Sequence, residues 1–164
     1  MVGFPGSGKT TWAEKYHPTV FRASQDELGS RHNFLKAVEQ HLKDGESVVA
    51  DRCNHTRRHR AALVQLARRY GASAEVVWVA TPHKQAVAQL KERKDHPTIP
   101  FESKEKISIY YRFSYEFDRP NLEQEEFDSL EIVGTVSRCI NCSLPTIQGP
   151  GDSFCVECHM DKNK

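Results

Sequence analysis

Apolar and polar residues alternate along this chain with two different spacings. At 30–43 and 56–70 the apolar side chains recur every three or four residues, which predicts helices with one buried face. Short apolar runs stand between such stretches and predict buried strands. The predicted strands are 19–22, 47–50, 75–80 and 130–133, and the further predicted helices are 11–16, 82–91 and 103–116.

The order of these elements predicts the fold class. Strands that are separated by helices pair in parallel through right-handed crossovers, which gives an α/β domain of three layers. Such a sheet binds its ligand at the carboxyl ends of its strands. We expect this domain to cover residues 1–135 and a small separate unit to cover residues 136–164.

The chain opens with a glycine-rich loop of the pattern G-x-x-x-x-G-K-T, and a predicted helix follows it. Backbone N–H groups of such a loop turn inward around an anion, and the positive end of the next helix points at the same place. Its lysine reaches the β- and γ-phosphates of a nucleoside triphosphate, and its threonine hydroxyl ligates Mg²⁺. The alternative is a Gly/Ser turn that matches the pattern by accident, which the flanking strand end and helix disfavour. The residues predicted to bind ATP are Gly3, Phe4, Pro5, Gly6, Ser7, Gly8, Lys9, Thr10 and Thr11.

Only Met1 and Val2 precede this loop, whereas a strand in that position usually has about five residues. We therefore expect the first strand of the P-loop kinase fold to be truncated. We also expect the chain to be a fragment of a longer protein with a further domain upstream.

Charge is distributed unevenly along the chain, although the net charge is only +1. Residues 51–70 hold six arginines and one acid, and residues 116–131 hold seven acids and one arginine. A solvated helix face is the alternative explanation of each run, and we expect it to hold for the acidic one. The chain has no signal peptide and no long apolar run, so we expect an intracellular protein, nuclear or cytoplasmic, without a membrane partner.

A kinase needs a base for the acceptor hydroxyl, a charge that stabilises the moving phosphoryl group, and a lid that excludes water. Asp26 follows the 19–22 strand and is the candidate base; the alternative is an N-cap of the next helix. Asp51 ends the 47–50 strand and is predicted to orient Mg²⁺ with Thr10, unless it only forms a turn. Arg93 lies in a charged segment that is typical of a lid, where it acts as an arginine finger or is merely an exposed basic residue.

Ordered motifs extend beyond the phosphate loop. They are V-G-F-P-G-S-G-K-T-T at 2–11, D-E-L-G-S at 26–30, V-V-A-D-R-C-N at 48–54, Y-Y-R-F at 110–113 and F-D-R-P at 117–120. In these motifs the chain resembles the 5′-hydroxyl polynucleotide kinases, most closely the kinase domain of the polynucleotide kinase/phosphatases. The resemblance covers about residues 1–135 and rests on the ordered set of motifs rather than on the loop alone.

The resemblance implies ATP-dependent phosphorylation of a 5′-hydroxyl end of DNA or RNA. It makes Asp26 the general base, assigns the nucleotide and Mg²⁺ contacts to Lys9 and Thr10, and assigns the lid arginine to Arg93. The chain departs from the family at Gln25, where the family often has an arginine, and at 52–53, where it often has Asn-Thr. Both departures concern the choice of substrate more than phosphoryl transfer.

The basic run supports a nucleic-acid partner independently of the resemblance. Arg57, Arg58 and Arg60 open the 56–70 helix, close to the expected mouth of the site. Arginines there can neutralise backbone phosphates and give affinity that falls steeply with salt. A solvated helix surface is the alternative.

The C-terminal tail carries two C-x-x-C pairs separated by twelve residues, with Cys139 and Cys142 in the first pair and Cys155 and Cys158 in the second. Four thiolates with this spacing suit a tetrahedral structural Zn²⁺, so the tail is predicted to be a zinc ribbon. Two disulfides are the alternative, which an intracellular location disfavours. Three roles of this ribbon remain open: contact with nucleic acid, binding of a protein partner, or stabilisation of the fold alone.

Two other functions also remain open at this stage. The same scaffold serves kinases of small molecules, and the phosphate loop does not separate them from polynucleotide kinases. An NTP-hydrolysing adaptor, with the ribbon as its partner-binding module, would carry the same loop.

Overall fold

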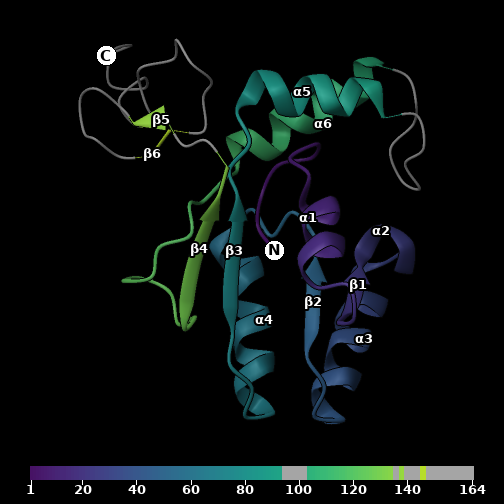
Figure 1. Cartoon of the computed structure of the whole chain (residues 1–164), viewed down its shortest axis with the longest axis vertical. Helices are drawn as coiled ribbons and strands as arrows, with labels where there is room; N and C mark the ends of the chain where they lie inside the picture. Colours follow the sequence, from purple (N-terminus) through teal and green to yellow (C-terminus); the bar gives the residue numbers. More distant parts are fainter. Residues whose placement is uncertain (94–102, 135–136, 139–144, 147–164) are drawn as a thin grey trace.

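The computed structural model describes residues 1–93, 103–134, 137–138 and 145–146 (Figure 1). Strand β1 (Phe21–Ser24) pairs in parallel with β2 (Val48–Asp51), and β3 (Glu75–Val79) pairs in parallel with β4 (Ser129–Val133). The backbone of the first three residues runs between the two pairs. Its amides and carbonyls bond to Val77 and Val79 on one side and to the residues at the end of β2 on the other. From one edge of the strands to the other, the order is therefore β1, β2, residues 1–3, β3 and β4.

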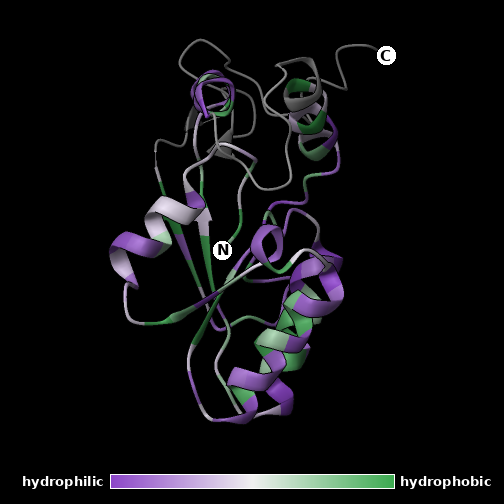
Figure 2. Ribbon diagram, turned by 90° about the vertical axis from the view of Figure 1, so that its right-hand side faces the viewer, coloured by the Kyte–Doolittle hydropathy of each residue, from purple (hydrophilic) through white to green (hydrophobic). Residues whose placement is uncertain are grey.

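Helices cover both faces of the strands, as the sequence predicts. Figure 2 shows α1 (Lys9–Tyr16) on one side, and α3 (Arg31–Lys43) with α4 (Arg57–Arg69) on the other. Two more helices, α5 (His83–Glu92) and α6 (Ser103–Tyr115), lie across the carboxyl edge of the strands (Figure 1). The three-layer α/β arrangement is thus confirmed for the described residues, none of whose helices has the length and apolar character that crossing a membrane requires.

The apolar faces of α3 and α4 form the core beneath β1 and β2. Phe34 and Val38 of α3 and Leu66 of α4 are buried together with Ala23 of β1. The inward faces predicted from the helical spacing are confirmed. The eighth predicted residue, Ala67, is buried outside this cluster, and seven belong to it: Phe34, Leu35, Val38, Leu42, Leu63, Leu66 and Tyr70. A second cluster joins Val64 of α4 to Val2, Val76 and Trp78 on the other side of the sheet centre.

Helices α5 and α6 are held to the phosphate loop by an apolar cluster. Phe4, the second residue of the loop, is 3% exposed and packs against Ala86 and Leu90 of α5 and Tyr110 of α6. The rings of Phe4 and Phe117 lie 4.7 Å apart, a distance typical of favourable aromatic pairs. The loop is therefore fixed from the side of α5 and α6 as well as by the sheet.

Among the described residues, β2 and β3 have no direct hydrogen bonds with each other. A cleft of about 660 Å³ lies between them, lined mainly by apolar side chains that include Val49 of β2, Leu63 of α4 and Val77 of β3. At its upper end the backbone of Met1 and Val2 bridges the two strands. Burial of the Met1 α-amino group there lowers its pKa to about 6. The cleft therefore lies between β2 and β3, in line with the extended backbone of residues 1–3.

Adding four apolar residues of high strand propensity before Met1 is expected to stabilise the protein. The added segment would pair with both β2 and β3, and each buried apolar side chain contributes roughly 2 kcal/mol. Ordering the added residues costs about 1–2 kcal/mol each, which leaves a net gain of about 2–3 kcal/mol. Because 1 kcal/mol raises the melting temperature of a domain of this size by about 2–4 °C, a rise of about 5–10 °C is expected. Thermal unfolding monitored by circular dichroism measures it. A Gly/Ser extension of equal length is the control, and an equal effect of both extensions would contradict the prediction.

Two short strands follow the main domain. β5 (Ser137–Arg138) pairs antiparallel with β6 (Pro145–Thr146). Cys139 and Cys142 lie between these strands in the sequence, but all four predicted zinc ligands fall outside the described residues.

Candidate active site

The phosphate loop has the conformation that its glycines predict. Gly6 and Gly8 have φ values of 77° and 86°, in the left-handed region that residues with a side chain rarely adopt. A Cβ atom on Gly6 would lie 2.3 Å from the carbonyl oxygen of Ala86, so the loop backbone packs directly on α5. The Thr81 hydroxyl, two residues beyond β3, donates a 2.7 Å hydrogen bond to the carbonyl of Ser7 and fixes the loop.

Replacing Gly6 with Ala is expected to destabilise the protein more than replacing Gly8 with Ala. Both variants place a side chain at positive φ, which costs about 1–2 kcal/mol. Only the Cβ at position 6 would meet backbone, because Gly8 has open space around it, and such overpacking adds about 1–3 kcal/mol. Chemical denaturation without nucleotide measures the difference. Equal losses in the two variants would contradict the packing of the loop on α5.

Lys9 is the first residue of α1, and its side chain turns into the phosphate loop. The Nζ atom donates a hydrogen bond of 2.7 Å to the carbonyl of Phe4, and the residue is only 9% exposed. The helix that begins here adds the partial positive charge of its N-terminus at the same place. The loop, the ammonium group and the helix end together form a site for the phosphates of a nucleotide.

Thr10 and Asp51 meet beside the phosphate loop, although 41 residues separate them in the sequence. The Thr10 hydroxyl donates to Oδ2 of Asp51 at 2.8 Å, and the Asp51 side chain is only 4% exposed. A hydroxyl and a carboxylate are oxygen ligands of the kind that Mg²⁺ prefers. The two residues therefore fit the Mg²⁺ site that the sequence predicts for them.

Arg22 is a site residue that the sequence analysis missed. Its guanidinium donates to Oδ2 of Asp51 at 3.0 Å and reaches Glu27 with its other end. The ion pair with a carboxylate that has almost no contact with solvent holds Asp51 in its orientation. An arginine within a four-residue strand carries no recognisable motif, and only the pairing of β1 with β2 brings the two side chains together.

Asp26 lies in the first turn of the short helix α2 (Gln25–Leu28) and is exposed. The alternative role as an N-cap does not hold, because Ser24 caps α2 and Ser30 caps α3. Ser24 is the β1 partner of Asp51 in β2, so the segments that carry Asp26 and Arg52 leave the sheet side by side. Asp26 interacts electrostatically with both Arg52 and Cys53. The sheet thus brings the predicted base to the same edge as the phosphate loop.

Cys53 and Asn54 have structural roles at this edge. Burial raises the pKa of the Cys53 thiol, which keeps the thiol neutral, so Cys53 packs as a small apolar residue. Asn54 is 2% exposed, and its amide donates to the carbonyl of Met1 at 2.9 Å. The backbone of Asn54 has a φ of 43°, which asparagine adopts more readily than most residues.

His55 lies just before the N-terminal end of α4. His55 is buried, and its Nε2 atom lies 3.2 Å from the carboxylate of Glu116 at the end of α6. Burial is the main cause of the lowered pKa of His55, so the neutral form of its ring is favoured. The ring of His55 also meets that of Phe113, 4.4 Å away, and these contacts attach the end of α6 to α4.

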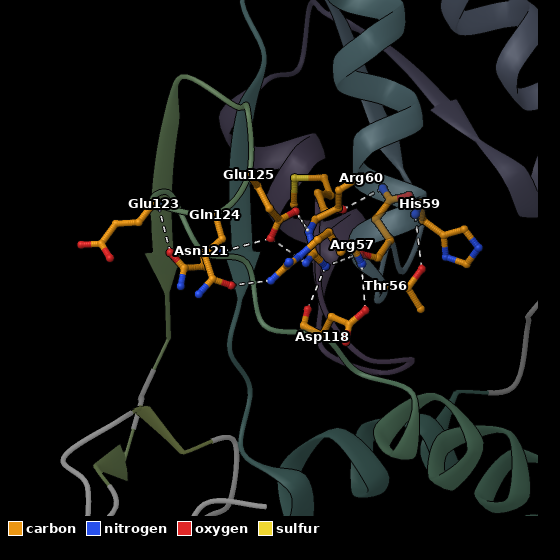
Figure 3. A network of polar contacts seen from close by, with 11 residues as sticks. Thr56, Arg57, His59, Arg60, Asp118, Asn121, Glu123, Gln124 and Glu125 are labelled. Atoms are coloured by element: carbon orange, nitrogen blue, oxygen red, sulfur yellow. Dashed lines mark hydrogen bonds and ion pairs between the residues drawn. The ribbon is translucent and has the colours of Figure 1, made fainter. Parts of the chain in front are cut away.

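The structure gives Arg60 a different role from the predicted contact with nucleic acid. Its guanidinium is 2% exposed and forms two hydrogen bonds with Glu125, at 2.7 and 2.8 Å (Figure 3). It also donates to the carbonyls of Asn54 and Asp118. All these groups lie in the protein interior, so Arg60 holds the acidic segment against α4 and does not face a ligand.

The acidic run is not the solvated helix face that the sequence analysis expects. It forms the connection from α6 into β4, and its carboxylates bind groups of α4 (Figure 3). Asp118 accepts from the backbone amide of Arg57, and Asp128 forms an ion pair with Arg68. The two runs therefore form ion pairs with each other at Arg60 and Arg68.

Arg57 and Arg58 remain exposed at the start of α4. The side chain of Arg57 bonds to Gln124. For these two residues, contact with nucleic acid remains a prediction.

Arg93 is exposed and caps the C-terminal end of α5. It lies one turn beyond Leu90, which packs near Gly6 of the phosphate loop. The lid segment that follows it, residues 94–96, falls outside the described residues. A role of Arg93 at the transferred phosphate therefore remains a prediction.

Comparison with known proteins gives the family. A family profile described as an AAA domain matches residues 21–117, which is more than half of the chain. The chain belongs to this family. The matched segment of the AAA domain holds Asp26, Asp51 and all of α4, and the phosphate loop and α1 precede it in the sequence.

Two curated relatives match shorter stretches of the chain. The bifunctional polynucleotide phosphatase/kinase of Schizosaccharomyces pombe is 38% identical over 72 residues, which are 43% of this chain and 18% of that protein. The transcription factor bHLH140 of Arabidopsis thaliana is 33% identical over 75 residues, 40% of this chain and 8% of that protein. The chain thus spans less than a fifth of the length of either relative. The predicted resemblance to a polynucleotide-kinase-like P-loop family is confirmed.

Proposed function

We propose that the chain transfers the γ-phosphate of ATP to the 5′-hydroxyl end of a polynucleotide, either DNA or RNA. The observation that carries this proposal is the position of Asp26 at the same sheet edge as Thr10 and Asp51, through the pairing of Ser24 with Asp51. A carboxylate at this edge can take the proton of an attacking hydroxyl. The match to a polynucleotide phosphatase/kinase supports the choice of acceptor.

Each part of the site has a role in the proposed reaction. Lys9 and the loop N–H groups hold the β- and γ-phosphates, and Thr10 with Asp51 would hold Mg²⁺, which neutralises phosphate charge when it is bound. Asp26 takes the proton of the 5′-hydroxyl while the hydroxyl oxygen forms its bond to the γ-phosphorus. The bond from that phosphorus to the β–γ bridging oxygen breaks, and ADP leaves. Arg93 stabilises the charge of the phosphoryl group during this transfer.

Acceptor competition tests the proposal. The chain is incubated with γ-labelled ATP and Mg²⁺, and offered a 5′-hydroxyl oligonucleotide, a nucleoside or water alone. We expect label on the oligonucleotide, and none with the Lys9→Met variant or with an oligonucleotide whose 5′ end already carries phosphate. Label on the nucleoside alone would instead indicate a kinase of small molecules, and release of inorganic phosphate alone would indicate a hydrolysing adaptor.

We further propose that the tail binds one structural Zn²⁺ through Cys139, Cys142, Cys155 and Cys158. The antiparallel pairing of β5 with β6, on either side of the first C-x-x-C pair in the sequence, supports a ribbon. Within the described part of the chain, no group of His, Cys, Asp and Glu is arranged to hold a metal, so a zinc ion found in the protein would point to the tail.

The Cys142→Ser variant is expected to lose zinc. A tetrahedral site with one of its four thiolates removed binds its metal much more weakly. Elemental analysis after dialysis should give about one zinc per chain for the unaltered protein and much less for the variant. The Cys53→Ser variant is the control and should keep its zinc. Zinc-free unaltered protein with two disulfides would contradict the proposal.

A further inference from the structure

Three arginines near the carboxyl edge of the strands form no ion pair in the described part of the chain, although Arg52 interacts electrostatically with Asp26. Arg31 is the first residue of α3, Arg52 directly follows β2, and Arg58 lies in the first turn of α4. Other arginines nearby do form ion pairs with acids: Arg22, Arg60, Arg68 and Arg69. Arg31 and Arg58 are exposed and Arg52 is half-buried.

The fold brings these three arginines to one place. Both α3 and α4 begin at the carboxyl edge of the parallel strands, and the two helices pack on each other. Arg52 extends from the end of β2 at the same edge, beside the segment that carries Asp26. Burial, and after it the like charge of Arg31, lowers the pKa of Arg52.

The placement of these charges does not serve the stability of the fold. A cation at a helix N-terminus opposes the helix dipole, and each one costs about 0.3–1 kcal/mol. Neither α3 nor α4 has an acid in its first turn to compensate for its arginines. A half-buried arginine close to another arginine adds repulsion to the cost of desolvation. An anionic ligand removes each of these penalties.

His59, also at the start of α4, experiences the same positive charge. Its pKa is lowered to about 4, first by burial and then by Arg52, His55, Arg31 and Arg58. The Nδ1 atom of His59 is buried without a hydrogen-bond partner in the described part of the chain. The charges of all three arginines therefore act on His59, and one of them, Arg52, also interacts with the predicted base Asp26.

We propose that Arg31, Arg52 and Arg58 form an acceptor-side anion site for the first internucleotide phosphate of the strand whose 5′-hydroxyl faces Asp26. This inference rests on the function proposed above and adds a reason for choosing a polynucleotide. Guanidinium groups bind phosphate with paired, charge-assisted hydrogen bonds. A nucleoside has no such phosphate, so the site selects a strand end over a small alcohol.

Equilibrium binding without ATP tests the anion site separately from catalysis. The probes are two labelled single-stranded 5′-hydroxyl oligonucleotides that differ only in the first linkage, a phosphodiester in one and a neutral methylphosphonate in the other. Fluorescence anisotropy is expected to show about tenfold tighter binding of the phosphodiester by the unaltered chain, as expected for a hydrogen-bonded charge. The Arg52→Met variant should bind the phosphodiester about tenfold more weakly and no longer distinguish the two probes.

Two further variants keep the test decisive. Arg31→Met changes an exposed side chain, so it retains the fold even if Arg52→Met does not, and it should also reduce the preference. Arg69→Met lies at the far end of α4, where Arg69 pairs with Glu39, and should bind both probes as the unaltered chain does. Melting temperatures establish that each variant is folded.

The outcomes separate this inference from the proposed function. An unaltered chain without preference, or folded Arg52→Met and Arg31→Met variants with the full preference, would overturn the anion site even if the oligonucleotide is phosphorylated. A preference that depends on Arg52, in a chain that phosphorylates no oligonucleotide, would support the anion site and refute the proposed kinase activity.

Discussion

The Asp26→Asn variant is expected to transfer phosphate to a 5′-hydroxyl oligonucleotide about 10²- to 10⁴-fold more slowly than the unaltered chain. Asparagine keeps the size and polarity of the side chain but cannot take the proton of the attacking hydroxyl. Ser24 rather than Asp26 caps α2, so the substitution leaves the cap of that helix intact. We therefore expect kcat to fall while ATP affinity and melting temperature stay near their original values.

Glu27→Gln is the matched control for this variant. Glu27 lies in the same helical turn, but its carboxylate bonds to Arg22 on the surface. Steady-state kinetics with labelled ATP should show only a small loss in this control. Transfer at the normal rate in Asp26→Asn would remove Asp26 from the role of base, and equal losses in both variants would indicate a general effect of charge.

The Arg60→Met variant is expected to lose about 3–5 kcal/mol of folding free energy, the usual effect of removing one partner from a buried ion pair. The side chains of Arg60 and Glu125 are 2% and 5% exposed, so Glu125 would keep a charge in a place that water scarcely reaches. The carbonyls of Asn54 and Asp118 would also lose their donor. Urea denaturation measures the loss.

Two comparisons distinguish this structural role from the nucleic-acid contact predicted from the sequence. Arg69→Met breaks an exposed pair with Glu39 and should cost about 1 kcal/mol or less. Arg60→Met combined with Glu125→Leu should recover much of the stability, because no buried charge is then left alone. Unchanged stability of Arg60→Met with weakened oligonucleotide binding would instead restore the original interpretation.

The different outcomes for Arg58 and Arg60 show a limit of reasoning from charge patterns. Both residues belong to one basic run, and the sequence gives no reason to separate them. Helical geometry places them about 200° apart around α4, so one faces solvent and the other faces the interior. The carboxylate that binds Arg60 comes from a segment 65 residues away. Such a pairing depends on the path of the chain and has no local signature.

Small shifts in the strands and one additional helix have local causes. The first strand covers Phe21–Ser24 rather than 19–22, because these four residues pair in register with Val48–Asp51 of β2. The sequence analysis did not predict α2, since a helix of four residues is too short to show an apolar period. Its single turn nevertheless carries Asp26 and therefore determines the position of the candidate base.

The sequence by itself determined the elements whose causes are local: the phosphate loop with its glycines, the apolar faces of α3 and α4, and the order of strands and helices. Only the tertiary structure decided which charges form ion pairs and which do not. Arg22 meets Asp51, and Arg60 meets Glu125, across sheet and helix contacts far apart in the sequence. The physical reason is that backbone conformation and helical period act over a few residues, whereas the partner of a charge depends on which distant segments pack together.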